Sequence, residues 1–374
     1  MTNSAEMHRL RRDEARRLVT ERIQEQPSWL ILTSLPNIRY LTGFSGSNAV
    51  LALHVNDASR DLLGTDGRYA EQVAVEAPGL PVLIDRSTLQ AVLAAIADGI
   101  SHPVGQGSAP TAIESTISLH GWQLVQRVLG STPVVTEGLV EELRVLKDPV
   151  EIAALEAACR ITAEAFEALL PQIRPGMTEI SIARRLEQLF GDFGAADRAF
   201  ETIVGSGPHS AIPHHQCSMR TIQSGDLLVI DAGALVDGYH ADMTRTVVVG
   251  KDPAPWQQEI HDLVADAQAR ALATVQHGAS LAQIDASART TIESAGFGEA
   301  FTHGLGHGVG LEIHEAPMIS ARATGSITAG TPITIEPGIY LAGRGGVRIE
   351  DTVLVTTEGA RVLTQLPRNL APVG

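Results

Sequence analysis

Two nine-residue segments of the chain follow one pattern, and each places an acid at the end of an apolar strand. The first, residues 225–233, reads Gly-Asp-Leu-Leu-Val-Ile-Asp-Ala-Gly and carries Asp231. The second, residues 330–338, reads Gly-Thr-Pro-Ile-Thr-Ile-Glu-Pro-Gly and carries Glu336. A single acid in such a place is usually an exposed surface residue. The duplication beside two apolar strands indicates a shared role instead.

A second acid follows each copy of the pattern. Asp242 and Glu350 stand two residues before Thr244 and Thr352. Four carboxylates therefore occupy two related hairpins, with no basic residue interleaved at these places. Such a cluster repels itself unless it is protonated or bound to cations. The sequence therefore predicts a site for divalent metal ions.

The dipeptide Asp237-Gly238 is a strong signal for a two-residue hairpin turn. With this turn, Asp231 lies opposite Thr244 and diagonal to Asp242. All three side chains then share one face of the hairpin, because strand side chains alternate with period two. Two carboxylates in this arrangement can converge on shared ions.

A glycine-rich stretch, residues 303–315, offers three histidines, His303, His307 and His314. Its alternating glycines argue against a zinc-binding helix, and they would let the backbone approach a metal closely. The stretch lacks the pattern of a phosphate-binding loop. Residues 43–47 do not fit the nucleophile elbow of serine hydrolases.

Charge favours two ions in the acidic cluster. Two divalent cations neutralise four carboxylates, whereas one ion would leave an unpaired surplus in a partly buried site. In the second hairpin Arg348 and Glu350 share a face by parity. Oxygen-rich ligands with one imidazole favour Mn²⁺, with Co²⁺ or Zn²⁺ also possible.

Composition indicates a soluble globular protein of two domains. The chain has 374 residues, of which 44% are hydrophobic, enough for a sizeable core. A formal net charge of -15 argues against nucleic acid or an anionic membrane as a partner. We expect Cys159 and Cys217 to be reduced in a cytoplasmic protein, because no signal-peptide pattern and no membrane-spanning run is present.

The order of elements predicts a small domain followed by a duplicated one. Residues 1–140 alternate short apolar runs with helical stretches, as in an α/β domain. Asp148 is predicted to cap a helix with Pro149 at its first position. From residues 147–374 the order helix, helix, hairpin occurs twice. We therefore expect an approximate two-fold axis that brings the acidic hairpins together.

These residues resemble the pita-bread metallopeptidases, and among them the Xaa-Pro peptidases, prolidase and aminopeptidase P. The resemblance covers the C-terminal region in sequence order and is weaker in the N-terminal part, which resembles a creatinase-like domain. It implies an α+β pita-bread fold with pseudo-two-fold halves, preceded by a smaller α/β domain. The matching segments are Asp231-Ala-Gly, Tyr239-His-Ala-Asp242-Met-Thr-Arg, residues 303–315, Ile335-Glu336-Pro-Gly and Val347-Arg-Ile-Glu350-Asp.

The resemblance implies roles for individual residues. The implied metal ligands are Asp231, Asp242, His307, Glu336 and Glu350, with Asp242 and Glu350 bridging the ions. His214 would help to hold the substrate, His314 would lie near the scissile carbonyl, and Arg348 would belong to the wall of the active site. We expect His303 to support the site without binding metal, and His209 and His215 to be ordinary solvated or core histidines.

The function implied is hydrolysis of the bond between an N-terminal residue and a following proline, by attack of a metal-bridging hydroxide. Glu336 would relay the proton and His314 would stabilise the oxyanion. The expected substrates are small peptides with proline in the second position, and a homodimer is the expectation from the family. Three alternatives on the same fold are a methionine aminopeptidase, a creatinase-like hydrolase and a catalytically inactive binding module.

One residue departs from the family pattern. Some prolidases carry an arginine four residues after the equivalent of His314, where it can hold the substrate carboxylate. This chain has Met318 at that position. The resemblance therefore does not extend to strict selection of dipeptides by that route.

Overall fold

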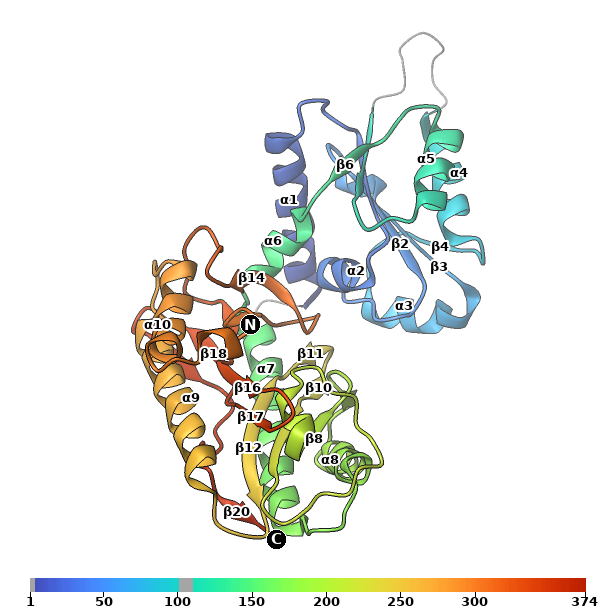
Figure 1. The fold of residues 1–374 in the computed structure, drawn as a ribbon. Coiled ribbons are helices and arrows are strands. Elements are labelled where there is room, and N and C mark those ends of the chain that lie inside the picture. Colours follow the sequence, from blue (N-terminus) through green and yellow to red (C-terminus); the bar gives the residue numbers. More distant parts are fainter. Residues whose placement is uncertain (1–3, 101–109) are drawn as a thin grey trace. The chain divides into compact units, whose positions relative to one another are not determined.

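The computed structural model describes residues 4–100 and 110–374. The chain divides into two compact units, Met1–Arg144 and Val145–Gly374 (Figure 1). Within the described ranges, no helix is long and apolar enough to cross a membrane.

The first unit is a mixed six-stranded sheet with helices on both faces. The strand order is β4-β3-β2-β1-β5-β6, and β1 pairs antiparallel with β2 and parallel with β5. One face packs against α4 and α5 through a core that includes Trp29, Ile31, Val92 and Val125. The predicted α/β character is confirmed. Its elements are α1 (Ser4–Arg22), β1 (Trp29–Leu32), α2 (Leu35–Thr42), β2 (Ala49–His54), β3 (Leu62–Thr65), α3 (Ala70–Glu76), β4 (Val82–Ile84), α4 (Thr88–Ile100), β5 (Thr111–Glu114), α5 (Leu119–Leu129), β6 (Val134–Thr136) and α6 (Leu139–Val145).

The second unit begins with a helix whose start is fixed by local hydrogen bonds. The Asp148 side chain accepts from the backbone of Val150 and Glu151, and the Glu151 side chain accepts from the backbone of Asp148. Pro149 occupies the first helical position, where its missing N–H costs nothing. The predicted cap is therefore confirmed.

Two helices and a set of strands make the first half of the second unit. Strands β8, β9 and β12 form one sheet with β20, and β10 and β11 form the hairpin tip that pairs with β7. The elements are α7 (Pro149–Leu169), α8 (Glu179–Asp192), β7 (Asp197–Arg198), β8 (Ile203–Ser206), β9 (Leu227–Ala232), β10 (Ala234–Val236), β11 (Tyr239–His240) and β12 (Met243–Val249).

The second half of this unit repeats the order. Strands β13, β14, β15, β18 and β19 form a five-stranded sheet, and β16 pairs with β17. The elements are α9 (Pro255–Thr274), α10 (Leu281–Ser294), β13 (Gly306–Gly308), β14 (Glu315–Ile319), β15 (Pro332–Ile335), β16 (Gly338–Leu341), β17 (Gly345–Arg348), β18 (Asp351–Val355), β19 (Ala360–Val362) and β20 (Pro372–Val373).

The two halves also share details of their backbone. Gly176 and Gly278 have φ angles of 92° and 84°, and each donates its N–H to an isoleucine carbonyl, Ile222 in one half and Ile327 in the other. Isolated bridges join Thr178 to Thr221 and Ser280 to Ser326 at the corresponding places. The predicted duplicated pita-bread fold is confirmed.

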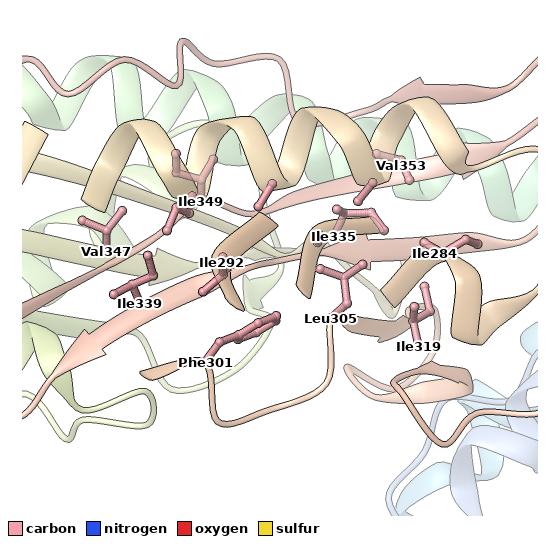
Figure 2. Packing of buried hydrophobic residues seen from close by; sticks show 14 of the residues in the cluster. Ile284, Ile292, Phe301, Leu305, Ile319, Ile335, Ile339, Val347, Ile349 and Val353 are labelled. Carbon is pink, nitrogen blue, oxygen red and sulfur yellow. The ribbon is translucent and has the colours of Figure 1, made fainter. Parts of the chain in front are cut away.

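Alternation along the strands turns the acids away from two separate cores. Ile230 and Ala232 of β9 lie in the core of the first half, so Asp231 between them points to the other face. Figure 2 shows Ile335 and Ile349 in the core of the second half. The neighbouring Glu336 and Glu350 therefore also face away from their core.

Candidate metal centre

The first acidic hairpin has the predicted register. Its turn residues Asp237 and Gly238 have φ angles of 48° and 76°, as a tight hairpin turn requires. Asp231 on β9 is paired with Thr244 on β12. Asp242 lies just before β12 and is 4% exposed, and Asp231 is 8% exposed. Both carboxylates are therefore held in a largely buried place by the hairpin backbone.

The polar faces of the two hairpins meet at Thr244. The Thr244 hydroxyl donates to the Glu350 carboxylate at 2.6 Å, and the Glu350 N–H donates to the Thr244 carbonyl at 3.1 Å. Asp242 and Glu350, one from each hairpin, belong with His307 to a group whose potential ligand atoms all lie within 4.8 Å of one another. The structure thus brings acids from both copies of the pattern together.

His307 presents one ring nitrogen to the acids. Its Nδ1 lies 2.9 Å from the carbonyl oxygen of Gly308 and donates to it, which leaves Nε2 free to accept. Nε2 lies 3.6 Å from Asp242 and 3.5 Å from Glu336. Burial lowers the pKa of His307 to about 4, so the ring is neutral near pH 7. This is the protonation state that a metal ligand needs.

The glycines beside His307 have a role in strand packing. A side chain at Gly306 would overlap the carbonyl oxygen of Thr334 on β15, and one at Gly308 would overlap that of Ala316 on β14. Glycine at these positions lets β13 pack closely between its neighbouring strands. The expected close approach of this backbone to a metal stays a prediction.

The carboxylates are held in an arrangement that disfavours their charge when no cation is bound. Burial, followed by repulsion from neighbouring acids, raises the pKa of Asp242 and of Glu350 well above their ordinary values. Burial raises the pKa of Glu336 to about 8. A group of acids built in this way is stabilised by positive charge from a metal or by protons.

An unsatisfied oxygen supports the fit of a cation. Asp231 Oδ1 is buried and has no hydrogen-bond partner, although buried polar atoms nearly always have one. The candidate ligands in the same cavity wall offer carboxylate oxygens and one neutral imidazole nitrogen, which suit Mn²⁺, Co²⁺ or Zn²⁺. The residues present therefore fit the metal ions implied by the sequence.

Arg348 brings a positive charge into the cluster. Its guanidinium donates to Asp231 Oδ2 at 2.6 Å and to the Thr244 hydroxyl at 3.0 Å. It also donates to the carbonyl oxygen of Pro213 at 3.1 Å. The expectation that no basic residue stands among the acids was wrong, because Arg348 of the second hairpin reaches across to Asp231 of the first. It offsets one of the four negative charges.

Tyr340 extends this network to His303 and was not identified from the sequence. Its hydroxyl accepts from Arg348 at 3.0 Å and lies 2.9 Å from His303 Nε2. His303 Nδ1 donates to the carbonyl oxygen of Gly304 at 2.8 Å. Nε2 is therefore left to accept from the tyrosine hydroxyl. The signal was available, since Tyr340 has the same strand parity as Glu336. His303 supports the site through Tyr340 and Arg348.

The Tyr340→Phe variant is expected to weaken metal binding by about tenfold to a hundredfold, because it loosens the guanidinium that orients Asp231. It should also lower the free energy of unfolding by about 1–2 kcal/mol through the lost hydrogen bonds. Calorimetric titration with Mn²⁺ and urea unfolding measure the two effects. Tyr69→Phe, in the first unit, removes a hydroxyl that contacts Ser47 and should leave metal affinity unchanged. Equal affinity in both variants would contradict this role.

The acids lie in the wall of a large cavity of the second unit. The cavity has a volume of about 1010 Å³, and its lining includes the candidate ligands together with His214, His314 and Met318. The His314 ring centroid lies 4.4 Å from that of His307. Burial, followed by the nearby His214, lowers the pKa of His314. The structure therefore brings both predicted substrate histidines to the cavity that holds the acids.

His209 and His215 are partly exposed, as expected for solvated or core histidines, with 33% and 10% of their side-chain surface accessible. The sequence analysis missed that both rings contact the buried carboxylate of Glu179 at 2.9 Å. Nothing in the spacing of these three residues indicated the contact. It depends on α8 and the segment after β8 folding against each other.

Comparison with known proteins identifies the family. The family model of the creatinase/prolidase N-terminal domain matches residues 15–146, and that of metallopeptidase family M24 matches residues 153–357. The chain belongs to metallopeptidase family M24. The resemblance to the pita-bread metallopeptidases, and with it the prediction of an enzyme, is confirmed.

Individual M24 relatives are similar over most of the chain. An Xaa-Pro dipeptidase of Pyrococcus furiosus is 45% identical over 234 residues, which cover 63% of this chain and 67% of the relative. A solved Xaa-Pro dipeptidase from Bacillus anthracis has a TM-score of 0.89 and 34% identity, covering 97% of this chain and 99% of that one. An X-Pro aminopeptidase from Thermotoga maritima has a TM-score of 0.85 and 34% identity, covering 96% and 99%.

Proposed function

We propose that this M24 protein is an Xaa-Pro peptidase, which hydrolyses the peptide bond between an N-terminal residue and a following proline. The observation that carries the proposal is the convergence of the acids of both hairpins with His307 in one cavity wall, with His214 and His314 in the same lining. Relatives named Xaa-Pro dipeptidase and X-Pro aminopeptidase support the substrate class.

Two divalent ions are the proposed cofactors, most favourably Mn²⁺. The residues that would hold them are Asp231, Asp242, His307, Glu336 and Glu350. Such ions, when bound, lower the pKa of a water molecule and polarise the scissile carbonyl. The unsatisfied Asp231 oxygen and the mutual repulsion of the acids support this assignment.

Glu336 and His314 are proposed to handle the proton and the developing charge. The Glu336 carboxylate takes a proton from the attacking water and passes it to the departing proline nitrogen. His314 donates an N–H to the oxygen that becomes negative in the transition state. Its lowered pKa keeps the ring neutral, with one nitrogen protonated. His214 holds the substrate beside it.

The cavity suits a proline residue. A bond that precedes proline is a tertiary amide with no N–H to donate, so the site must recognise the ring by shape and apolar contact. Phe200, Ile203, Pro213 and Ile313 supply apolar atoms to the same lining as the acids. Met318 also lines it and is 52% exposed, so no cation stands at this position to hold a carboxylate.

A homodimer and a cytoplasmic location stay predictions.

Peptide assays with the metal-loaded protein test the proposal. The protein is expected to bind about two equivalents of Mn²⁺ by elemental analysis, and to hydrolyse Ala-Pro or Ala-Pro-Ala but not Ala-Ala-Ala. Met-Ala-Ala and creatine test the methionine aminopeptidase and creatinase alternatives. Absence of cleavage of every proline peptide by the loaded protein would refute the proposal. A preparation that takes up no metal would favour the inactive binding module.

A further inference from the structure

A second polar cluster surrounds Glu179, the first residue of α8. The side chain is completely buried, and each carboxylate oxygen meets three donor groups. Those on Oε1 are the Ser206 N–H at 2.9 Å, the Ser206 hydroxyl at 2.7 Å and His209 Nδ1 at 2.9 Å. Those on Oε2 are the Ser218 N–H at 3.1 Å, the Ser218 hydroxyl at 2.6 Å and His215 Nε2 at 2.9 Å.

The carboxylate is ionised and already saturated. Burial by itself raises the pKa of Glu179, but hydrogen bonds from Ser218, Ser206 and His215 outweigh it and lower the pKa to about 2. The start of α8 also favours negative charge. Glu179, His209 and His215 are spaced closely enough to hold a cation. A cation would have to displace the serine donors, however, because a carboxylate offers about four lone pairs.

The donors come from both ends of one segment, residues 206–218. His214 lies inside this segment, next to His215, and lines the cavity of the acids. The opposite side of the segment is tied to the second half of the unit, because Gly346 donates its N–H to the Ser210 hydroxyl at 2.9 Å and Arg348 donates to the Pro213 carbonyl. The segment is thus held between Glu179 on one side and Arg348 on the other.

We propose that Glu179 is a positioning residue, which fixes residues 206–218 so that His214 faces the substrate. The inference rests on the proposed function, since it assigns to Glu179 the support of a substrate-holding histidine. Among the described residues, Glu179 contacts none of the acids of the metal centre. Its effect on catalysis should therefore pass through His214.

The Glu179→Gln variant tests this role. The amide matches the carboxylate in shape but replaces an acceptor with a donor, so it opposes the serine donors. We expect kcat/KM for a proline peptide to fall by about tenfold to a hundredfold, mainly through a higher KM, because small misplacements of a substrate-holding group have effects of this size. Metal content should not change. Glu167→Gln, an exposed residue of α7, is the matched control and should behave as wild type.

Amide hydrogen exchange gives a readout that does not depend on activity. The Ser206 and Ser218 amides donate to Glu179, so their exchange should rise by at least about tenfold in Glu179→Gln, as for the loss of a hydrogen bond to a charged group. Amides of β12, elsewhere in the sheet to which Ser206 belongs, should not change. Ser218→Ala removes one hydroxyl donor and keeps the charge, and it should give a smaller rise in the same amides.

A double-mutant cycle separates positioning from general stability. In a His214→Ala background, Glu179→Gln should reduce kcat/KM little further, because both changes remove the same interaction. An additive loss, a loss of metal, or unchanged kcat/KM and exchange in Glu179→Gln would each overturn the inference. If the wild-type protein cleaves no proline peptide, the proposed function fails, whereas the exchange experiment still decides whether Glu179 fixes this segment.

Discussion

The Asp242→Ala and Glu350→Ala variants are expected to lose at least about a thousandfold in kcat while they remain folded. Each removes a carboxylate that is proposed to hold the metal ions, and metal-ion catalysis contributes several kcal/mol to such reactions. A thousandfold loss corresponds to about 4 kcal/mol in the activation free energy. Steady-state assays with a proline peptide at saturating Mn²⁺ measure the effect.

The fold should survive these changes for an electrostatic reason. The pKa of Asp242 is raised by burial and then by Glu350, Asp231 and Glu336, so in the metal-free protein this carboxylate repels its neighbours. The isosteric Asp242→Asn variant removes the charge without leaving a cavity. It should have a free energy of unfolding equal to or above that of metal-free wild type, together with the same loss of activity.

A control at the tip of the same hairpin isolates the role of the site. Asp237 is exposed and has a φ angle of 48°, which asparagine tolerates well. Asp237→Asn is therefore the same chemical change outside the site and should keep full activity and metal content. Near wild-type turnover in Asp242→Ala or Glu350→Ala would show that the acidic cluster is not the catalytic centre.

The acidic hairpins could be predicted because their information is local. A two-residue turn at Asp237 sets which residues face each other, and alternation then decides which side chains share a face. The pairing of Asp231 with Thr244 follows from these two facts alone. The meeting of the two hairpins followed from the repeat, because equivalent faces of a duplicated unit come together at a two-fold axis.

Contacts between segments that share no pattern could not be predicted. Lys147 and Glu315 form a buried ion pair at 2.7 Å, although 168 positions separate them. Asp351, next to Glu350, points the other way and bonds Arg245 and Gln268. Neither the Glu179 cluster nor the reach of Arg348 to Asp231 has a sequence signature. Such contacts depend on how whole elements pack, and the sequence gives only their residue types.

Removal of the metal is expected to make stability fall as pH rises. The pKa values of Asp242, Glu336 and Glu350 are raised in the folded, metal-free protein, that of Glu336 to about 8. In the unfolded chain these groups titrate near pH 4. The folded state therefore holds more protons between these limits. The stabilisation from Glu336 is full below about pH 4 and is lost as pH rises through about 8, and that from Asp242 and Glu350 is lost as pH rises through their own raised pKa values.

The difference between metal-loaded and metal-free protein should therefore widen with pH. Each proton that the folded state must release lowers its stability by up to about 1.4 kcal/mol per pH unit, whereas bound cations relieve the repulsion and stabilise the fold by mass action. Urea unfolding of chelator-treated and Mn²⁺-loaded protein from pH 5.5 to 8.5 measures this difference.

The Glu336→Gln variant should flatten the pH dependence of the metal-free form, and Glu167→Gln should not. A difference that stays constant across this range would mean that the acids are not strained without metal, and the electrostatic reason for binding two ions would then be lost.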